Sequence, residues 1–311
     1  MADLGEFGVI ARITAGRVQP AATLLGPGDD AALVAAPDGR VVAGTDVLVE
    51  GVHFRLDWST PHQVGRKAVA ANLADIAAMG AAPTGLLVGL ACPSDAPVSL
   101  VQSLVDGMWE EAAQVGAGVV GGDVVSADKI VISVAALGDL QGRAPVVRSG
   151  AGAGEVLGVC GRLGWAAGGL AVLSRGFRSP LTVVGAHRVP EPPYRAGPQA
   201  AAAGATAMID ISDGLLSDAG HLATASGVAI DIDSTALVVP RRLVEVASAL
   251  GADARHWVLT GGDDHALLAS FPAGAALPTG WTPIGAVREG CGVTVDGGRY
   301  EGPAGWDHFR S

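Results

Sequence analysis

Aspartates that follow glycines or end apolar segments recur along the whole sequence, and their chemistry can be considered first. They lie in GPGDDAAL, AGTDVLVEGVHF, ANLADIAAMGA, VVGGDVVS and MIDISDGLLSD, and they are Asp29, Asp30, Asp46, Asp75, Asp123, Asp210 and Asp213. Any one of them alone is more often a turn or helix-capping residue than a ligand. Together they indicate a shared role, because glycine turns and strand ends are where α/β folds bind ligands.

Carboxylates that converge need cations between them. Two unit charges of the same sign 4 Å apart repel by about 4 kcal/mol at an effective dielectric constant near 20. The candidate ligands are all oxygens, and no His or Cys has zinc-site spacing, so Mg²⁺ is the expected cation. Mg²⁺ held by carboxylates usually keeps positions open for water and substrate phosphates. The pattern therefore predicts phosphoryl transfer assisted by Mg²⁺.

One of these aspartates lies in an apolar helical stretch, AVAANLADIAAMGAAP (68–83). Thr60 and Gln63 have capping-box spacing, a proline follows at the first helical position, and Gly-Ala-Ala-Pro ends the run, which predicts a helix over 61–79. Asp75 shares a face with Asn72, but the helix is apolar nearly all round and should be buried. A buried aspartate must be paired, protonated or bound to a metal. The alternative is an exposed aspartate on a wrongly assigned polar face.

The segments that must position these residues alternate in type. Apolar, β-branched stretches at 40–46, 129–140 and 155–161 are separated by alanine-rich helical ones, which predicts an α/β or α+β fold. The length of 311 residues favours two domains. The glycine-rich RSGAGAGE (148–155) is the expected connection, with domains at 1–149 and 150–311, and PEPPYRAGP (190–198) is an expected loop.

The composition excludes several classes of protein. Hydrophobic residues make up 49% of the chain and charged residues 16%, so a large core is available. The net charge is −11 and no Lys/Arg cluster occurs, so nucleic acid is not an expected partner. Cys92, Cys160 and Cys291 are isolated in the sequence, which favours a reducing cytoplasm. No apolar run approaches the ~18 residues of a membrane span, and the N-terminus lacks a secretory pattern.

Other nucleotide and catalytic motifs are weak or missing. GPGDDA fits G-x-G-x-x-A, but two aspartates would stand where a pyrophosphate should lie. No G-x-x-x-x-G-K-[ST], G-x-S-x-G or H-E-x-x-H occurs, so a P-loop and nucleophilic serine catalysis have no support.

The motifs GPGDDAAL, TDVLVEGVHF, ANLADIAAMGA, GGD, VRSGA, DISDGL, LTGGDDHALL and GWDHF follow one another along nearly the whole chain. In this order they resemble the thiamine-monophosphate kinase family. That family is related to aminoimidazole ribonucleotide synthetase, selenophosphate synthetase and the hydrogenase maturation factor, which share the first several motifs. The resemblance implies a two-domain PurM-like α/β fold, in which the N-terminal mixed sheet and its helices form a barrel with a second copy and a C-terminal α/β domain completes the site.

The same resemblance implies an activity and a set of site residues. The activity is ATP-dependent phosphorylation of thiamine monophosphate to thiamine diphosphate, by direct in-line transfer in a cytoplasmic homodimer. The implied ligands of several Mg²⁺ ions are Asp30, Gly44, Thr45, Asp46, Asp75, Asp123, Asp210 and Asp213. The expected catalytic residues among them are Asp30, Asp75, Asp123 and Asp210. The implied nucleotide contacts are Gly122, Asp123, Arg148 and Ser212, and the implied contacts to the thiamine substrate are His53, Asp263 and Trp306.

Two departures from the family pattern bear on these roles. The usual GGEDY is GGDDH here, at 261–265, and the usual serine before TD is Gly44. The shorter Asp263 could weaken the thiamine contact, whereas Gly44 keeps a backbone carbonyl for a metal. Taken without the resemblance, His53 could equally pack a strand end and Trp306 could be a core aromatic residue.

Two other functions are compatible with parts of the sequence. One is a sister enzyme of the superfamily. Against selenophosphate synthetase, this sequence has no N-terminal cysteine, and against the hydrogenase maturation factor, it has no C-terminal cysteine. The other is a non-catalytic sensor of Mg-ATP, which the altered GGDDH motif keeps open.

Overall fold

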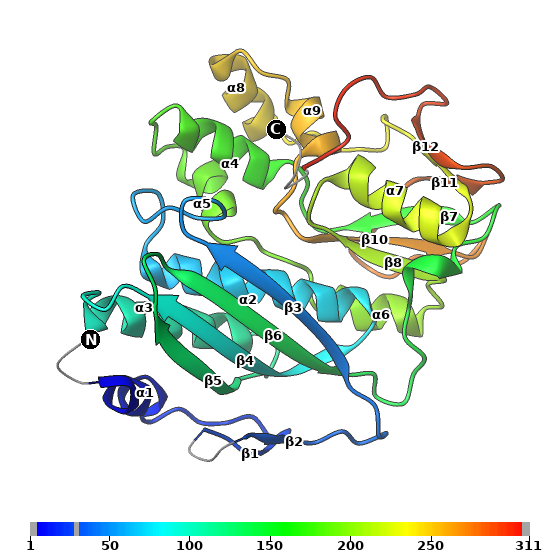
Figure 1. The fold of residues 1–311 in the computed structure, drawn as a ribbon. Coiled ribbons are helices and arrows are strands. Elements are labelled where there is room, and N and C mark those ends of the chain that lie inside the picture. Colours follow the sequence, from blue (N-terminus) through cyan, green and yellow to red (C-terminus); the bar gives the residue numbers. More distant parts are fainter. Residues whose placement is uncertain (1–4, 28–30, 307–311) are drawn as a thin grey trace. The chain divides into compact units, whose positions relative to one another are not determined.

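The computed structural model describes residues 5–27 and 31–306, and its internal contacts divide the chain into two compact units (Figure 1). The first unit comprises Met1–Ile76 and Ala81–Gly142, and the second comprises Ala77–Gly80 and Arg143–Ser311. The chain thus enters the second unit for good at residue 143, close to the glycine-rich segment expected to connect the domains. Each unit combines a mixed sheet with helices, so the predicted α/β class is confirmed.

The first unit is built on a four-stranded sheet with the order β3-β6-β4-β5. Its strands are β3 (Val42–Val49), β4 (Ala82–Cys92), β5 (Val119–Ser126) and β6 (Val131–Asp139). β4 and β5 are parallel, and the other neighbours are antiparallel. The remaining elements are α1 (Gly5–Thr14), β1 (Thr23–Leu25), β2 (Leu33–Val34), α2 (Pro61–Ala78) and α3 (Val98–Ala113).

The helix predicted over 61–79 is α2, which ends one residue earlier. Its capping box is formed as expected: Thr60 N donates to Gln63 Oε1 at 3.0 Å, and Gln63 N donates to Thr60 Oγ1 at 3.3 Å. The helix is buried on most of its surface, with Val69 and Leu73 fully inaccessible. α2 and α3 cross closely because each carries a glycine at the contact. A Cβ on Gly107 would lie 1.9 Å from His62 O.

The two faces of the four-stranded sheet differ. Figure 1 shows α2 and α3 on one face, and side chains on that face, such as Ile132 and Val134, are buried. The opposite face exposes apolar side chains: Val47 is 47% accessible, Leu87 40% and Val125 51%. Within the described part of this unit, no helix covers that second face.

The second unit contains a six-stranded sheet with the order β12-β9-β11-β7-β10-β8. Its strands are β7 (Val156–Cys160), β8 (Ala207–Ile211), β9 (Ala229–Ile232), β10 (Ala266–Phe271), β11 (Trp281–Arg288) and β12 (Gly292–Val295). Its helices are η1 (Arg148–Gly150), α4 (Trp165–Ser174), α5 (Leu181–Arg188), α6 (Ala196–Ala202), α7 (Leu215–Ser226), α8 (Arg241–Leu250) and α9 (Ala254–Thr260). One core packs α7 and α9 against the sheet, and a second core packs α6 and the last residues of α2 against it.

Two local boundaries differ from the predictions. The β segment expected over 40–46 is β3, which continues to Val49, so that Thr45 and Asp46 lie inside the strand rather than at its end. The loop expected over 190–198 ends where α6 begins at Ala196. The proline at 198 falls in the first turn of that helix, where a missing backbone N–H costs nothing.

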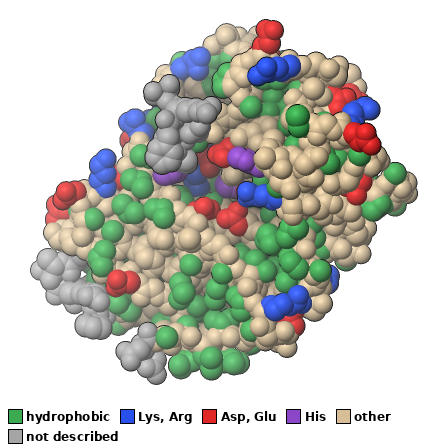
Figure 2. All heavy atoms as spheres, turned by 45° about the vertical axis from the view of Figure 1, so that its right-hand side comes forward, with side chains coloured by type: hydrophobic (Ala, Val, Ile, Leu, Met, Phe, Trp, Pro, Cys, Tyr) green, Lys and Arg blue, Asp and Glu red, His purple; other side chains and the backbone are tan. Residues whose placement is uncertain are grey.

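Basic side chains are dispersed over the surface. Figure 2 shows Lys and Arg side chains spread over the visible face. Across residues 5–27 and 31–306, no helix is both long and apolar enough to cross a bilayer.

Candidate functional site

In the first unit, the polar face of α2 meets β3. A Cβ on Gly44 would lie 3.7 Å from Asp75 Oδ2, so this carboxylate stands directly beside the strand. Asn72 is fully buried; its Oδ1 accepts from Asp46 N at 2.9 Å, and its Nδ2 donates to Ala68 O at 2.9 Å. Asn72 therefore ties helix to strand. The half-buried Asp75 carboxylate lies beside Gly44, two residues before Asp46 on the same face of β3.

Thr45 is on the opposite face of β3 from this pair. Its side chain is exposed, and its Oγ1 donates to Val134 O at 2.9 Å. The alternation of the strand thus separates the Thr45 hydroxyl from Asp46 and Asp75. A contribution of Thr45 to the same ion would come from its backbone carbonyl.

Asp123 is not brought to Asp46 and Asp75 within the chain. Asp46 and Gly122 lie in one row across the sheet, at opposite edges and three strand spacings apart, about 14 Å. The Asp123 side chain lies on the open face, and its Oδ1 accepts from Val124 N at 2.8 Å. Asp30, the remaining predicted ligand of this unit, lies outside the described residues.

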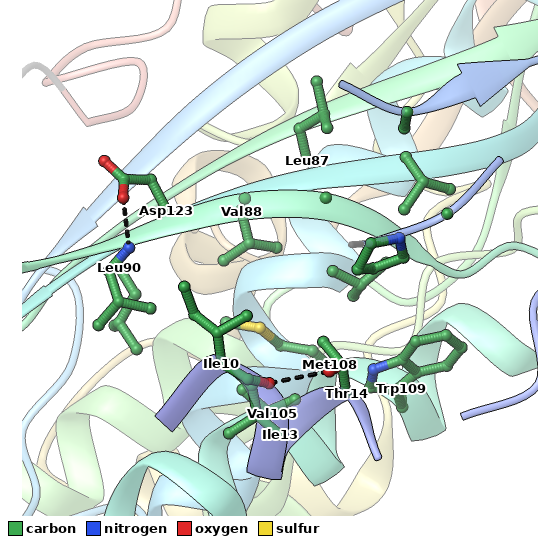
Figure 3. Close-up of a pocket in the computed structure, with 18 of the residues that line it drawn as sticks. Ile10, Ile13, Thr14, Leu87, Val88, Leu90, Val105, Met108, Trp109 and Asp123 are labelled. Atoms are coloured by element: carbon green, nitrogen blue, oxygen red, sulfur yellow. Dashed lines mark hydrogen bonds between the residues drawn. The ribbon is translucent and has the colours of Figure 1, made fainter. Parts of the chain in front are cut away.

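A cavity of about 560 Å³ opens beside the predicted nucleotide contacts (Figure 3). Gly122 and Asp123 of β5 line it, together with apolar residues of β4, α1 and α3. Figure 3 shows Ile10 and Ile13 of α1 on the side of the cavity toward Val105 and Met108 of α3. The cavity combines a glycine-bearing strand with apolar walls, which suits a flat heterocycle.

His53 follows β3 in a turn, where its side chain has a structural contact. Its Nδ1 accepts from Val49 N at 3.0 Å, which fixes the hydrogen of the neutral ring on Nε2. His53 therefore has a structural role, because its side chain binds the backbone at the end of β3.

In the second unit, Asp210 and His265 form a buried pair. Asp210 lies on the same face of β8 as Met208. His265 lies two residues before Leu267, and Leu267 and Met208 belong to the same hydrophobic core. His265 Nδ1 is 3.0 Å from Asp210 Oδ2, and both side chains are less than 10% exposed. Burial acts to lower the pKa of His265, but Asp210 and Asp263 outweigh it and raise the pKa to about 10.

The GGDDH loop continues the pairing of β10 with β8. Asp263 N donates to Ser212 O at 2.8 Å, and a Cβ on Gly262 would lie 2.2 Å from that same oxygen, so only glycine permits the approach. Asp263 and His265 have φ values of 70° and 52°, a region that non-glycine residues rarely occupy. The loop therefore places the backbone of Asp263 beside Ser212.

Trp306 also reaches the end of β8. Its backbone N donates to Asp213 O at 2.9 Å, while its side chain is 60% exposed. The alternative of a core aromatic residue is therefore wrong. The Trp306 side chain and the partly exposed Asp263 side chain are both accessible to solvent.

Asp213 belongs to a group of possible metal ligands that sequence reasoning did not identify in full. Asp213, Asp218 and His221 each offer one donor atom, and these atoms lie within 4.8 Å of one another. Burial, and then the charges of Asp210 and Asp213, raise the pKa of Asp218 to about 8. Burial is the larger cause and repulsion by the neighbouring carboxylates adds to it; a divalent cation between these donor atoms would relieve that repulsion. The signal was available, because Asp218 and His221 are three residues apart on α7, just after DISDGL.

Arg148 and Ser212 are not brought together. Ser226 Oγ, at the end of α7, donates to Arg148 O at 2.7 Å, and a Cβ on Gly150 would lie 1.9 Å from Thr206 O. Arg148 thus lies where β8 begins, whereas Ser212 follows its end. The five residues of β8 separate them by about 17 Å along the strand.

Asp264 gives the second unit a pH-dependent stability. Its Oδ1 accepts from Ala166 N at 2.9 Å, at the start of α4, and its Oδ2 is buried without a hydrogen bond from any described residue. Burial raises its pKa to about 7. Because this folded-state pKa lies above the unfolded value, the carboxyl is most stabilising below about pH 4, and its contribution falls as the pH rises through about 7.

Asp264→Asn should remove that pH dependence, because the amide oxygen can still accept from Ala166 N and carries no charge. The free energy of unfolding of the wild type, relative to the variant, should fall by up to about 4 kcal/mol between pH 4 and pH 8. Urea unfolding at both pH values measures it. Asp253→Asn, at the exposed cap of α9, is the control. An unchanged pH slope in Asp264→Asn would contradict the assignment.

Comparison with known proteins adds an independent observation. Residues 28–140 match the family described as "AIR synthase related protein, N-terminal domain". The chain is 56% identical to the thiamine-monophosphate kinase of Mycobacterium tuberculosis, over 99% of this chain and 92% of that one. The crystal structure of thiamine-monophosphate kinase from Stenotrophomonas maltophilia K279a matches with a TM-score of 0.83 and 33% sequence identity. The match covers 95% of this chain and 98% of that one. A structure described as "AaThiL complexed with AMPPCP and TMP" is 34% identical, with a TM-score of 0.82 and coverage of 99% and 98%.

Proposed function

Because this chain belongs to the thiamine-monophosphate kinase family, we propose that it transfers the γ-phosphoryl group of ATP to thiamine monophosphate, giving thiamine diphosphate and ADP. The observation that carries the proposal is the gathering of carboxylates with an exposed tryptophan at the end of β8, in a chain 56% identical to such a kinase. The solved structure described as a complex with AMPPCP and TMP supports the same pair of substrates.

Mg²⁺ is the proposed metal. Asp46 and Asp75 would hold it in the first unit, and Asp210 and Asp213 in the second; when bound, it neutralises phosphate charge. Asp30, Gly44, Thr45 and Asp123 remain predicted ligands.

The acceptor chemistry places few demands on the protein. A phosphate monoester has a second pKa of about 6, so the attacking oxygen is largely deprotonated at neutral pH and needs no general base. The task of the chain is to hold two anions in line. The exposed Trp306 ring can stack on a cationic thiazolium, and the Asp263 carboxylate can pair with positive charge on the same substrate.

Each unit has a proposed share in this work. The first unit, predicted as residues 1–149, would bind metal and the nucleotide, with the adenine in the cavity beside Gly122 and Asp123. The second, predicted as 150–311, would complete the nucleotide site through Ser212 and bind the thiamine substrate. Arg148, just before it, remains a predicted nucleotide contact. A cytoplasmic location is part of the proposal, since ATP is the co-substrate.

Val105→Phe tests the nucleotide cavity. Val105 lines the cavity from α3, so a larger side chain should fill space that the base needs and raise the KM for ATP about tenfold, with a smaller effect on the KM for thiamine monophosphate. Steady-state kinetics with each substrate varied in turn measures both constants. Equal effects on the two KM values would argue against the placement of the nucleotide.

A direct assay tests the function as a whole. Purified protein with ATP and Mg²⁺ should phosphorylate thiamine monophosphate and leave other phosphate monoesters of a small panel unchanged. Consumption of ATP with a different acceptor alone would remove the proposal. Calorimetric binding of Mg-ATP without any product would favour a nucleotide sensor instead.

A homodimer is the proposed assembly, and the open face of the four-stranded sheet is its proposed interface. That face exposes Val47, Leu87 and Val125, which another copy could cover. Val47→Lys should weaken association at least about a hundredfold, because a charge would have to be buried. Sedimentation measures it, and Val244→Lys on α8, where the valine is equally exposed at 48%, is the control. A monomeric wild type would contradict the proposal.

A further inference from the structure

We propose that His265 is a positioning residue that couples the metal-binding carboxylate of Asp210 to the substrate-binding carboxylate of Asp263. The inference rests on the proposed function of those two carboxylates. It concerns the residue at which this chain departs from the GGEDY pattern.

The first half of the coupling is the hydrogen bond between His265 and Asp210. The backbone register places them close, since Leu267 of β10 is opposite Asp210 of β8, and His265 N donates to Ile211 O at 3.0 Å. An ionised carboxylate can only accept, so the hydrogen must be on His265 Nδ1, 3.0 Å from Asp210 Oδ2. This bond holds Oδ2 of Asp210 and thereby fixes the plane of the whole carboxylate group, including Oδ1. Fixing the orientation of a ligating carboxylate in this way strengthens metal binding.

The second half lies on the other side of the same ring. His265 Nε2 is 3.8 Å from Asp263 Oδ1, and His187 Nδ1 of α5 is 3.6 Å from Asp263 Oδ2. These are ion-pair rather than hydrogen-bond distances. Asp263 therefore lies between two imidazoles, and its side chain is still 36% exposed and accessible to a substrate.

The chemistry of the ring explains why histidine and the shorter acid occur together. Imidazole has two nitrogens on opposite sides, so one ring can face two carboxylates at once. A tyrosine has a single hydroxyl and can donate to only one. The unusual φ values of Asp263 and His265 show that the backbone is held in a rarely populated conformation, in which the His265 ring lies between the Asp210 and Asp263 carboxylates.

Two substitutions separate the halves. His265→Asn retains a donor near the position of Nδ1 and removes the side that faces Asp263. His265→Gln places its donor near Nε2 and removes the bond to Asp210. Mn²⁺ binding, measured by electron paramagnetic resonance without substrates, and thiamine monophosphate binding, measured by calorimetry without ATP, are the readouts.

The expected result is an opposite pattern in the two variants. His265→Gln should weaken Mn²⁺ binding about 10- to 100-fold and leave thiamine monophosphate binding within about threefold of wild type. His265→Asn should bind Mn²⁺ almost as the wild type does and lose about tenfold in affinity for thiamine monophosphate. His62→Gln, a histidine on α2 that pairs with Glu110, is the control and should change neither.

Unchanged binding in both variants would overturn the inference, and so would equal loss of both ligands with a lowered melting temperature, which is the result of a purely structural role. Failure of the proposed function is distinguishable, because the wild type itself would then bind no Mn²⁺ or no thiamine monophosphate; that result would remove the coupling as well.

Discussion

Asp75→Asn is expected to fold like the wild type and to lose at least about a thousandfold in kcat, which corresponds to about 4 kcal/mol of transition-state stabilisation. Asparagine has the same shape, and the position is only half-buried, so packing against β3 should persist. The lost property is the negative charge, on which the proposed binding of Mg²⁺ depends. Kinase activity as a function of Mg²⁺ concentration measures the effect, together with thermal unfolding.

Asp95→Asn is the matched control, since it removes the same charge from an exposed position of the same unit. It should leave both kcat and the Mg²⁺ dependence unchanged. Full activity of Asp75→Asn at limiting Mg²⁺ would show that the carboxylate serves packing rather than metal.

Gly107→Ala is expected to lower the free energy of unfolding by about 3 kcal/mol or more, the upper end for an overpacked core. The new methyl group would lie 1.9 Å from His62 O, and backbone cannot rotate away as a side chain can. A Cβ on Gly65 of α2 would lie 1.9 Å from Leu104 O in the same way, so neither helix has space for a side chain where the two cross. Chemical denaturation measures the change.

Gly185→Ala is the control of opposite sign. Gly185 lies inside α5, and a Cβ there would meet nothing within 4 Å, so alanine should stabilise the protein by up to about 1 kcal/mol. A stable Gly107→Ala variant would mean that α2 and α3 can separate without loss.

Local elements were largely predictable from the sequence. The capping box, the proline at the first helical position and the terminal glycine identified α2 to within one residue, and β-branched runs identified β3, β6 and β7. These signals depend on residues that are neighbours in the chain. They were less exact about where a strand ends, since the segment expected over 40–46 continues as β3 to Val49.

The composition of the site was predictable in part. Residue types and the order of the motifs indicated carboxylates, Mg²⁺ and a phosphate-bearing substrate. The burial of Asp218, the pairing of His265 with Asp210 and the exposure of Trp306 were not, because each depends on contacts between distant segments.

By itself the sequence determined which side chains are available and which short segments form helices and strands, since both follow from neighbouring residues. Only the tertiary structure decided which of these side chains meet. Strand order puts Asp123 at the far edge of the sheet from Asp46, and the pleat puts Thr45 on the face opposite Asp75. Register and strand order arise from pairings between residues far apart in the chain, and no local pattern specifies them.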